Sequence, residues 1–133
     1  MPTTLPDTQL VPLFWVGTSR RDLKEFPEDV QDAMGYALFV AQTGGKHPAA
    51  KPLKGDGAFR GAGVLEIIDN FDGNTYRAVY TVKFAGVVYA LHAFQKKAKK
   101  GIATPQGDIA KIKSRMKTAA EHYQKNIATR EAG

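Results

Sequence analysis

Three stretches rich in β-branched and aromatic residues, separated by tight-turn signals, constrain the fold of this chain more than any other feature. They cover residues 64–71, 75–84 and 87–95. Residues 72–74 read Asp-Gly-Asn, which is a strong hairpin signal, and an Ala-Gly turn at residues 85–86 separates the second stretch from the third. The pattern predicts an antiparallel meander of strands.

Two amphipathic helices flank the predicted meander. The first follows Pro27 and ends at a glycine pair at residues 44–45. Its apolar residues recur at the spacing of a buried helical stripe: Val30, Ala33, Met34, Ala37, Leu38 and Ala41. The second opens at Pro105 and Asp108, and its apolar face comprises Ile109, Ile112, Met116, Ala119 and Tyr123.

A short apolar run and a shorter helix precede these elements. Residues 13–16 are either an edge strand or a packed lead-in segment, and Thr18 or Ser19 can cap a helix that runs to Phe26. We therefore predict an α+β fold. N-terminal helices, a small antiparallel sheet and a C-terminal helix follow one another, and we expect the helices to pack on one face of the sheet.

The chain has 133 residues, a length that suits one compact domain. We expect this domain over residues 11–126, between a flexible leader at 1–10 and a flexible tail at 127–133, with an irregular, basic, glycine-rich connection at 46–63. The N-terminus lacks the pattern of a signal peptide, and no apolar run is long enough to span a bilayer. A cytoplasmic location is therefore expected.

Positive charge is concentrated in the second part of the chain. Residues 1–50 carry four Lys/Arg and six Asp/Glu, whereas residues 51–133 carry fifteen and seven. Such a basic half points to a polyanionic partner such as RNA, DNA or an anionic membrane, although a merely solvated surface has the same composition. The chain has no cysteine, which excludes disulfides and thiolate sites.

Period-2 alternation predicts which side chains share a face of the sheet. It groups four polar residues on one face: Glu66, Arg77, His92 and Lys96. Leu91 and Ala93 are expected to point the other way. If the helices cover that opposite face and no bulge intervenes, the polar face is open. The preceding connection would add three cations: Lys51, Lys54 and Arg60.

This set of residues suits cleavage of an RNA backbone. Attack by a ribose 2′-hydroxyl on the adjacent phosphate needs a proton acceptor, cations for the phosphorane and a proton donor for the departing 5′-oxygen. Histidine is the natural proton carrier near neutral pH, and a lysine can act only if nearby cations lower its pKa. Structural readings stay open: His92 as a satisfied core residue, Arg77 as an ion-pair partner of Glu66, and residues 96–100 as a solvated loop. The histidines show no metal-ligand spacing, so neither a metal nor another cofactor is expected.

Four short segments form an ordered set along the chain. They are residues 51–55 (KPLKG), 64–67 (VLEI), 76–80 (YRAVY) and 89–97 (YALHAFQKK). Followed by a proline-led helix, they resemble the RelE/ParE toxin superfamily, and most closely its phage-related, HigB-like branch. The resemblance spans about residues 13–123. It implies a metal-independent, ribosome-dependent mRNA endoribonuclease that is neutralised by an antitoxin, commonly a helix-turn-helix protein.

The resemblance also implies roles for individual residues. Arg77 would stabilise the transition state and His92 would transfer protons, with further catalytic contributions from Lys54 and Lys96. The implied RNA-binding residues are Lys51, Arg60, Lys97, Lys99 and Lys100. Residues 66–68 read Glu-Ile-Ile where many relatives have Glu-Leu-Arg, so one customary arginine is absent. Tyr123 could replace the C-terminal tyrosine of some members only if the last helix ends beside the site.

Two other functions stay open at this point. A ParE-like toxin shares the fold but inhibits DNA gyrase without catalysis, and a phage-derived binding module could have kept the fold without the chemistry. His92, close to the lysine pair at residues 96–97, favours cleavage, because a gyrase inhibitor needs no proton carrier there.

Overall fold

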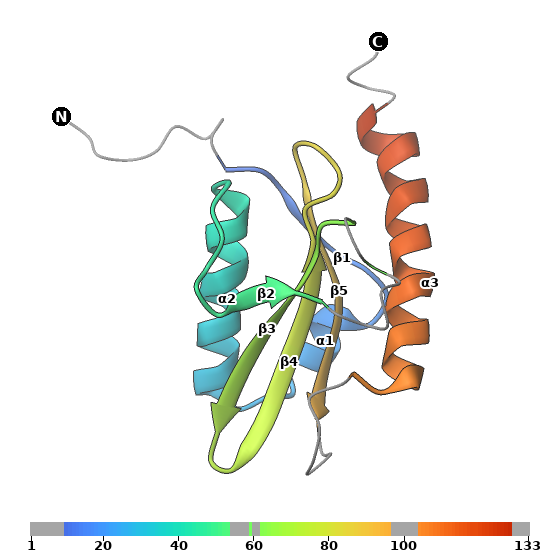
Figure 1. Cartoon of the computed structure of the whole chain (residues 1–133). Helices are drawn as coiled ribbons and strands as arrows, with labels where there is room; N and C mark the ends of the chain where they lie inside the picture. Colours follow the sequence, from blue (N-terminus) through green and yellow to red (C-terminus); the bar gives the residue numbers. More distant parts are fainter. Residues whose placement is uncertain (1–9, 54–58, 60–61, 97–103, 129–133) are drawn as a thin grey trace, which may run out of the picture.

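The computed structural model describes residues 10–53, 59, 62–96 and 104–128 (Figure 1). Within these residues the elements are, in order, β1 (Leu13–Trp15), α1 (Ser19–Leu23), α2 (Glu28–Gln42), β2 (Ala50–Pro52), β3 (Val64–Phe71), β4 (Asn74–Thr81), β5 (Val88–Lys96), α3 (Gln106–Tyr123) and a π-helical turn, η3 (Gln124–Ala128). The predicted α+β class is confirmed. The domain bounds stay a prediction, because residues 1–9 and 129–133 lie outside the described part of the chain.

The strands form one sheet in the order β1-β5-β4-β3-β2. Strands β3, β4 and β5 are the predicted antiparallel meander, and the turn between β3 and β4 places Asp72 and Gly73 at φ values of 52° and 80°. Strand β1 pairs in parallel with β5, so the run at residues 13–16 contains an edge strand. Strand β2 lies within residues 46–63, which we expected to be irregular. That expectation is wrong for β2, because main-chain pairing with β3 orders it.

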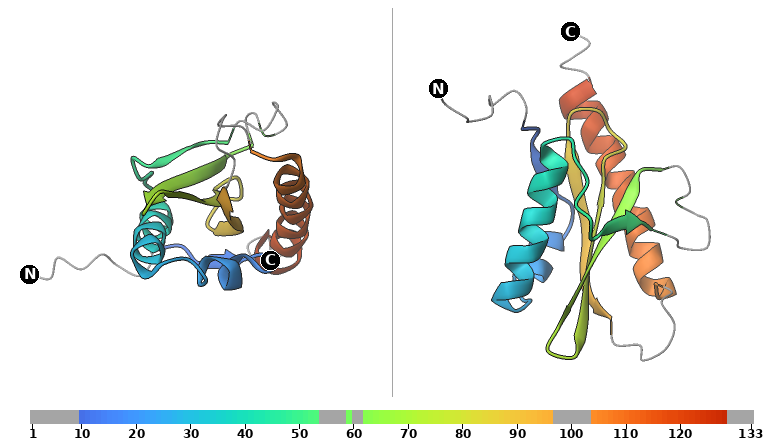
Figure 2. Two further views of the ribbon diagram at one scale, coloured as in Figure 1. Left: turned by 90° about the horizontal axis from the view of Figure 1, so that it is seen from below. Right: turned by 60° about the vertical axis from the view of Figure 1, so that its left-hand side comes forward.

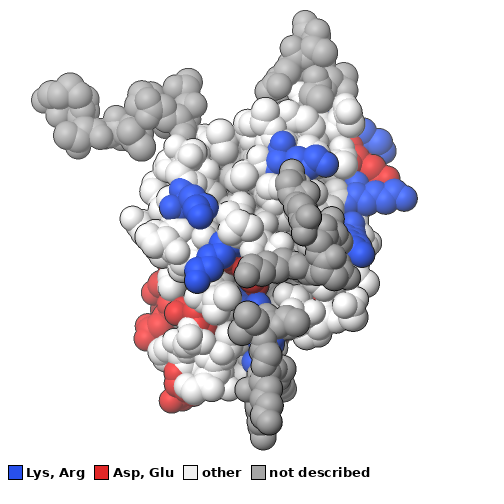
Figure 3. Space-filling view, viewed as in Figure 1, with Lys and Arg blue, Asp and Glu red and all other residues white. Residues whose placement is uncertain are grey.

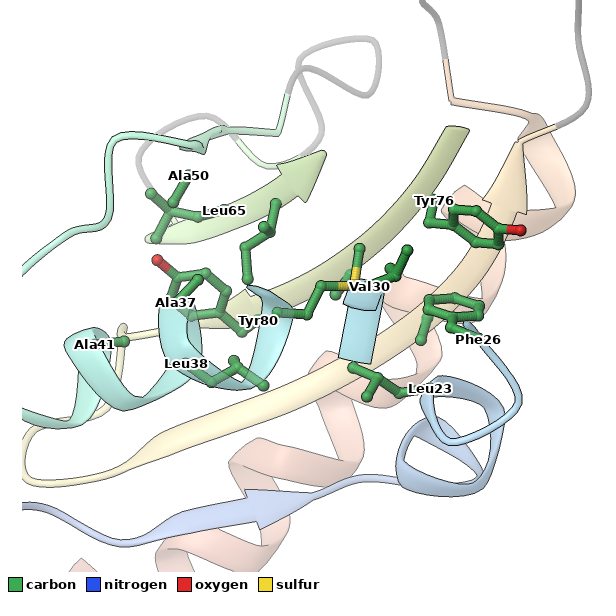
Figure 4. Packing of buried hydrophobic residues seen from close by; sticks show 14 of the residues in the cluster. Leu23, Phe26, Val30, Ala37, Leu38, Ala41, Ala50, Leu65, Tyr76 and Tyr80 are labelled. Atoms are coloured by element: carbon green, nitrogen blue, oxygen red, sulfur yellow. The ribbon is translucent and has the colours of Figure 1, made fainter. Parts of the chain in front are cut away.

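Helices cover both faces of the sheet, as the two views of Figure 2 show. Helix α2 packs on one face, where Val30 and Leu38 join the same apolar cluster as Tyr80 of β4 (Figure 4). Helix α3 packs on the other face, where Ile112 joins a second cluster with Val79. The predicted packing of helices on one face is therefore wrong. An apolar stripe requires a helix to be covered, but it does not specify which face of the sheet provides the cover.

The two long helices otherwise follow their predicted apolar patterns. In α2 the predicted stripe is buried except for Ala33, which lies at its border and is exposed. In α3 the fully covered positions are Ile109, Ile112 and Ala119. None of the helices in the described ranges combines the length and apolar character that a bilayer crossing requires.

A β-bulge in β5 determines which residues face α3. The register between β4 and β5 shifts between Val79 and Tyr80, which leaves Leu91 as an extra residue immediately before His92. Leu91 therefore packs in the cluster beneath α3, on the same side as Val79, and the prediction that it points away is wrong. Ala93 does lie on the α2 side, as predicted.

Candidate functional site

The strand register brings the four predicted polar residues to one face of the sheet. Glu66 pairs with Val79, which pairs with His92, and directly paired residues project from the same side. Arg77 and Lys96 lie an even number of positions from Val79 and His92, so they share that face. The expectation that this face is open is wrong, because α3 packs on it. Glu66, Arg77, His92 and Lys96 are only 8%, 4%, 4% and 7% exposed.

Three of these residues form what we call the arginine cluster: Glu66, Arg77 and Lys96. Arg77 Nη1 donates a hydrogen bond to Glu66 Oε1 at 2.8 Å, as the structural reading of the sequence anticipated. Arg77 Nε is buried and has no hydrogen-bond partner among the described residues. A buried donor without an acceptor is costly, so an incoming anion that supplied the acceptor would bind favourably.

Lys96 completes the electrostatics of the arginine cluster. Burial lowers the pKa of Lys96, the positive charge of Arg77 lowers it further, and the carboxylate of Glu66 acts in the opposite direction. The Nε–H of Arg77, unsatisfied within the described residues, therefore suits this cluster to bind an anion.

The remaining predicted residue, His92, belongs to a second group that joins β5, α3 and α1. We call this the histidine cluster: Thr18, Asp22, His92, Asp108 and Arg115. His92 Nε2 lies 2.6 Å from Asp108 Oδ1, and His92 Nδ1 lies 3.3 Å from Arg115 Nη1. Arg115 also donates to the main-chain oxygen of Leu91 and to Thr18 Oγ1, at 2.9 Å each.

Hydrogen bonding fixes the protonation of the His92 ring. A guanidinium can only donate, so Nδ1 accepts from Arg115 and Nε2 carries the proton that is donated to Asp108. Burial lowers the pKa of His92, although the hydrogen bond and charge of Asp108 partly oppose that effect. The ring is therefore neutral at pH 7 and both nitrogens are engaged. The prediction of an accessible imidazole at position 92 is wrong.

Arg115 fastens α3 to the rest of the fold. Its hydrogen bond to Leu91 satisfies a carbonyl at the β-bulge, and its contact with Thr18 reaches the start of α1, where Thr18 Oγ1 donates to Asp22 at 2.7 Å. Gly17 leaves room for the guanidinium: at φ +59°, a Cβ on this residue would lie 2.7 Å from Arg115 Nε. The histidine cluster is thus a clamp between helix and sheet.

The other predicted site residues divide into two groups. Lys51 is exposed on β2 directly opposite Glu66, so it borders the face of the arginine cluster. The rest lie outside the described residues: Lys54, Arg60, Lys97, Lys99 and Lys100. Tyr123 is remote from the site. Its ring packs against that of Phe84 in a tilted arrangement, and its hydroxyl donates to the main-chain oxygen of Ala85.

Comparison with known proteins shows the family. The profile of the family described as "Phage derived protein Gp49-like (DUF891)" matches residues 21–117, well over half of the chain. The chain belongs to this family. The predicted resemblance to a phage-related branch is thereby confirmed. No functionally curated protein matches the Gp49-like chain significantly.

A solved structure also resembles the Gp49-like chain. It is a chain of the toxin–antitoxin complex RelBE2 from Mycobacterium tuberculosis, with 20% sequence identity and a TM-score of 0.46. The match covers 65% of the Gp49-like chain and 99% of the other.

Sequence reasoning singled out only His92 among the members of the histidine cluster in the Gp49-like protein. It assigned Asp108 only to the start of the last helix, and Arg115 entered only the count of basic residues. Both lie on the side of α3 that carries Ile112, at positions i and i+7. Two charged residues beside an apolar helix stripe were the available signal that polar partners lie opposite.

Proposed function

We propose that this Gp49-like protein is the toxin of a type II toxin–antitoxin system and cleaves mRNA on the ribosome. The arginine cluster carries the proposal. It brings buried Lys96 to the same sheet face as the Arg77–Glu66 ion pair, and Arg77 Nε has no hydrogen-bond partner among the described residues. The family match and the basic second half of the chain agree with a polyanionic substrate.

The proposed reaction joins the ribose 2′-oxygen to the adjacent phosphorus and breaks the bond from phosphorus to the 5′-oxygen. The products are a 2′,3′-cyclic phosphate and a 5′-hydroxyl, with the 2′-hydroxyl proton passing to a base and another proton reaching the 5′-oxygen. Arg77 would stabilise the negative phosphorane, held in place by Glu66. Lys96, whose pKa is lowered, is suited to one of the proton transfers, and no step requires a metal.

We infer a role for His92 that differs from the one expected from the sequence. With both ring nitrogens engaged, His92 would act through the position of α3 rather than on the phosphate. Because Arg77 and Lys96 are buried, part of their cover must move before RNA reaches them. Exposed Lys51, at the border of that face, would meet the RNA backbone first.

The proposed setting follows from the reaction. The protein would act in the cytoplasm with mRNA and the ribosome as partners, and an antitoxin of the helix-turn-helix type would neutralise it. A second candidate is a binding module without activity, which the burial of Arg77, His92 and Lys96 favours. A ParE-like gyrase inhibitor would share the fold but would need none of the three.

A translation extract programmed with a defined message tests the proposal. Primer extension should show cuts within codons only when ribosomes are engaged. Arg77→Gln and Lys96→Gln should each reduce the cutting rate by about a hundredfold or more, because each removes a charge from the phosphorane. The matched control is Lys113→Gln, a substitution of an exposed lysine on α3, which should cut as the wild type does.

The outcomes separate the candidates. Thermal unfolding first establishes that each variant is folded. Ribosome-dependent cutting by a folded Arg77→Gln variant would exclude the arginine cluster as the site. Intact messages with stalled gyrase complexes would establish the ParE-like function, and intact messages with unimpaired growth would establish the binding module.

A further inference from the structure

The outer face of α2 is apolar where a helix in contact with water is usually polar. Tyr36 and Phe39 are 59% and 45% exposed, and they are two of the four large apolar side chains exposed in the described residues. Their rings stack with centroids 6.5 Å apart. Exposed aromatic side chains that gather on one face are characteristic of surfaces that bind other proteins.

The aromatic pair is held in a fixed arrangement. The ring of His47 meets Tyr36 edge-on at 5.6 Å, and His47 Nδ1 accepts a hydrogen bond from the main-chain nitrogen of Ala49 at 3.0 Å. A partner would therefore meet rings that are already ordered, which reduces the entropy lost on binding.

Acidic residues continue the same face towards the start of the helix. Glu28 and Asp32 precede Tyr36 at spacings of four residues, so the three lie in one row along α2. Both carboxylates are exposed, and residues 28–42 include no lysine or arginine. In Figure 3 the acidic side chains gather at the end of the molecule where α2 begins. The outer face of α2 thus has one acidic half and one aromatic half.

Gly35 adds an independent observation. It lies in the middle of α2, beside Asp32 and Phe39 on the helix surface, where glycine destabilises a helix relative to alanine. A Cβ at Gly35 would meet no atom of this chain within 4 Å, so the fold itself does not require a glycine there. Close approach of a partner would account for it.

We propose that the outer face of α2, formed by Glu28, Asp32, Gly35, Tyr36 and Phe39, docks a cationic amphipathic helix of a partner protein. Two copies of this chain would not pair through α2, because each would set carboxylates against carboxylates with no lysine or arginine on either helix, so the cations must come from a different surface. A helix fits because its side-chain ridges can lie in the gap above Gly35. The proposal is independent of RNA cleavage, since α2 covers the face of the sheet opposite the arginine cluster.

Selection from a displayed library of helices tests this surface. The full-length protein is immobilised, and the library presents single helices randomised at their outward positions. The selected helices should carry Lys or Arg at one end and apolar residues at i, i+3 and i+4 towards the other. Selected helices without basic residues would overturn the proposal.

Binding of the strongest selected helix to variants then locates the contact. A double substitution, Tyr36→Ser with Phe39→Ser, should weaken binding by about thirtyfold or more. Asp32→Lys should weaken it by about fivefold and reduce its dependence on salt. Gly35→Ala should raise the thermal stability of the protein while it weakens binding.

The matched control is Val82→Ser, which removes an exposed apolar side chain from a different part of the surface and should leave binding unchanged. Circular dichroism checks that every variant is folded. Unchanged binding after loss of both aromatic rings would overturn the proposal. So would sedimentation velocity that shows the wild type to self-associate through Tyr36 and Phe39.

Discussion

Two polar clusters lie on the face of the sheet on which α3 packs, and they differ in how their donors are satisfied within the described residues. In the histidine cluster both ring nitrogens of His92 and both terminal nitrogens of Arg115 have hydrogen-bond partners. In the arginine cluster Arg77 Nε has no hydrogen-bond partner among the described residues. A complete network stabilises a fold, whereas an unsatisfied buried donor lowers its stability and points to binding or chemistry. The difference agrees with a structural role for the histidine cluster and with the reaction proposed for the arginine cluster.

The largest effect should come from separating the ion pair of the arginine cluster. Glu66→Leu leaves the buried charge of Arg77 without its carboxylate and should lower the free energy of unfolding by about 3–5 kcal/mol. Replacing both residues with leucine should cost much less, because no unpaired charge remains. Urea unfolding of the single and double variants measures both values. Equal losses in the two variants would show that packing, and not charge, is what the pair contributes.

A smaller loss of stability should follow from removing the Arg115 side chain from the histidine cluster. Arg115→Met removes the donor that satisfies the carbonyl of buried Leu91 and should lower the free energy of unfolding by about 1–3 kcal/mol. Amide hydrogen exchange should accelerate along α3 more than along α2. Lys113→Met, on the exposed side of the same helix, is the control and should change neither quantity. If exchange in α3 were unaltered by Arg115→Met, the histidine cluster would not be what holds the helix.

The smallest effect should be a dependence of stability on pH. His92 has a pKa lowered from 6.5 by burial, so between its folded value and 6.5 the unfolded chain binds more protons than the folded chain. The contribution of His92 to the free energy of unfolding is therefore fully present above pH 6.5 and declines as the pH falls below that value. Urea unfolding from about pH 5 to about pH 8 should show this decline in the wild type and a weaker one in His92→Gln. Identical pH profiles would mean that folding does not lower the pKa of His92.

Much of the fold was predictable because its signals are local. The turn at residues 72–74 and the alternation on either side of it specify the meander, and the stripes of α2 and α3 specify two covered helices. The shared face of Glu66, Arg77 and Lys96 followed from the same alternation. It survived the β-bulge because the extra residue, Leu91, precedes the polar part of β5.

The cover over the site was not predictable, because it depends on contacts between distant segments. Nothing in the apolar stripe of α3 indicates that it packs on the face that carries His92 and not on the other. The partners of His92 lie sixteen and twenty-three residues further along the chain. A histidine next to cations therefore looked like an accessible acid or base, whereas it is a neutral, buried link.

The parallel pairing of β1 with β5 has a consequence for the synthesis of this protein. Residues 13–15 pair with residues 88–90, and Thr18 is bonded to Arg115, 97 positions later. The first strand therefore emerges from the ribosome long before its neighbour exists, and such distant pairing forms late in folding. A nascent chain therefore cannot complete the histidine cluster until residue 115 has been translated, so the contacts that hold α3 to the sheet are among the last to form.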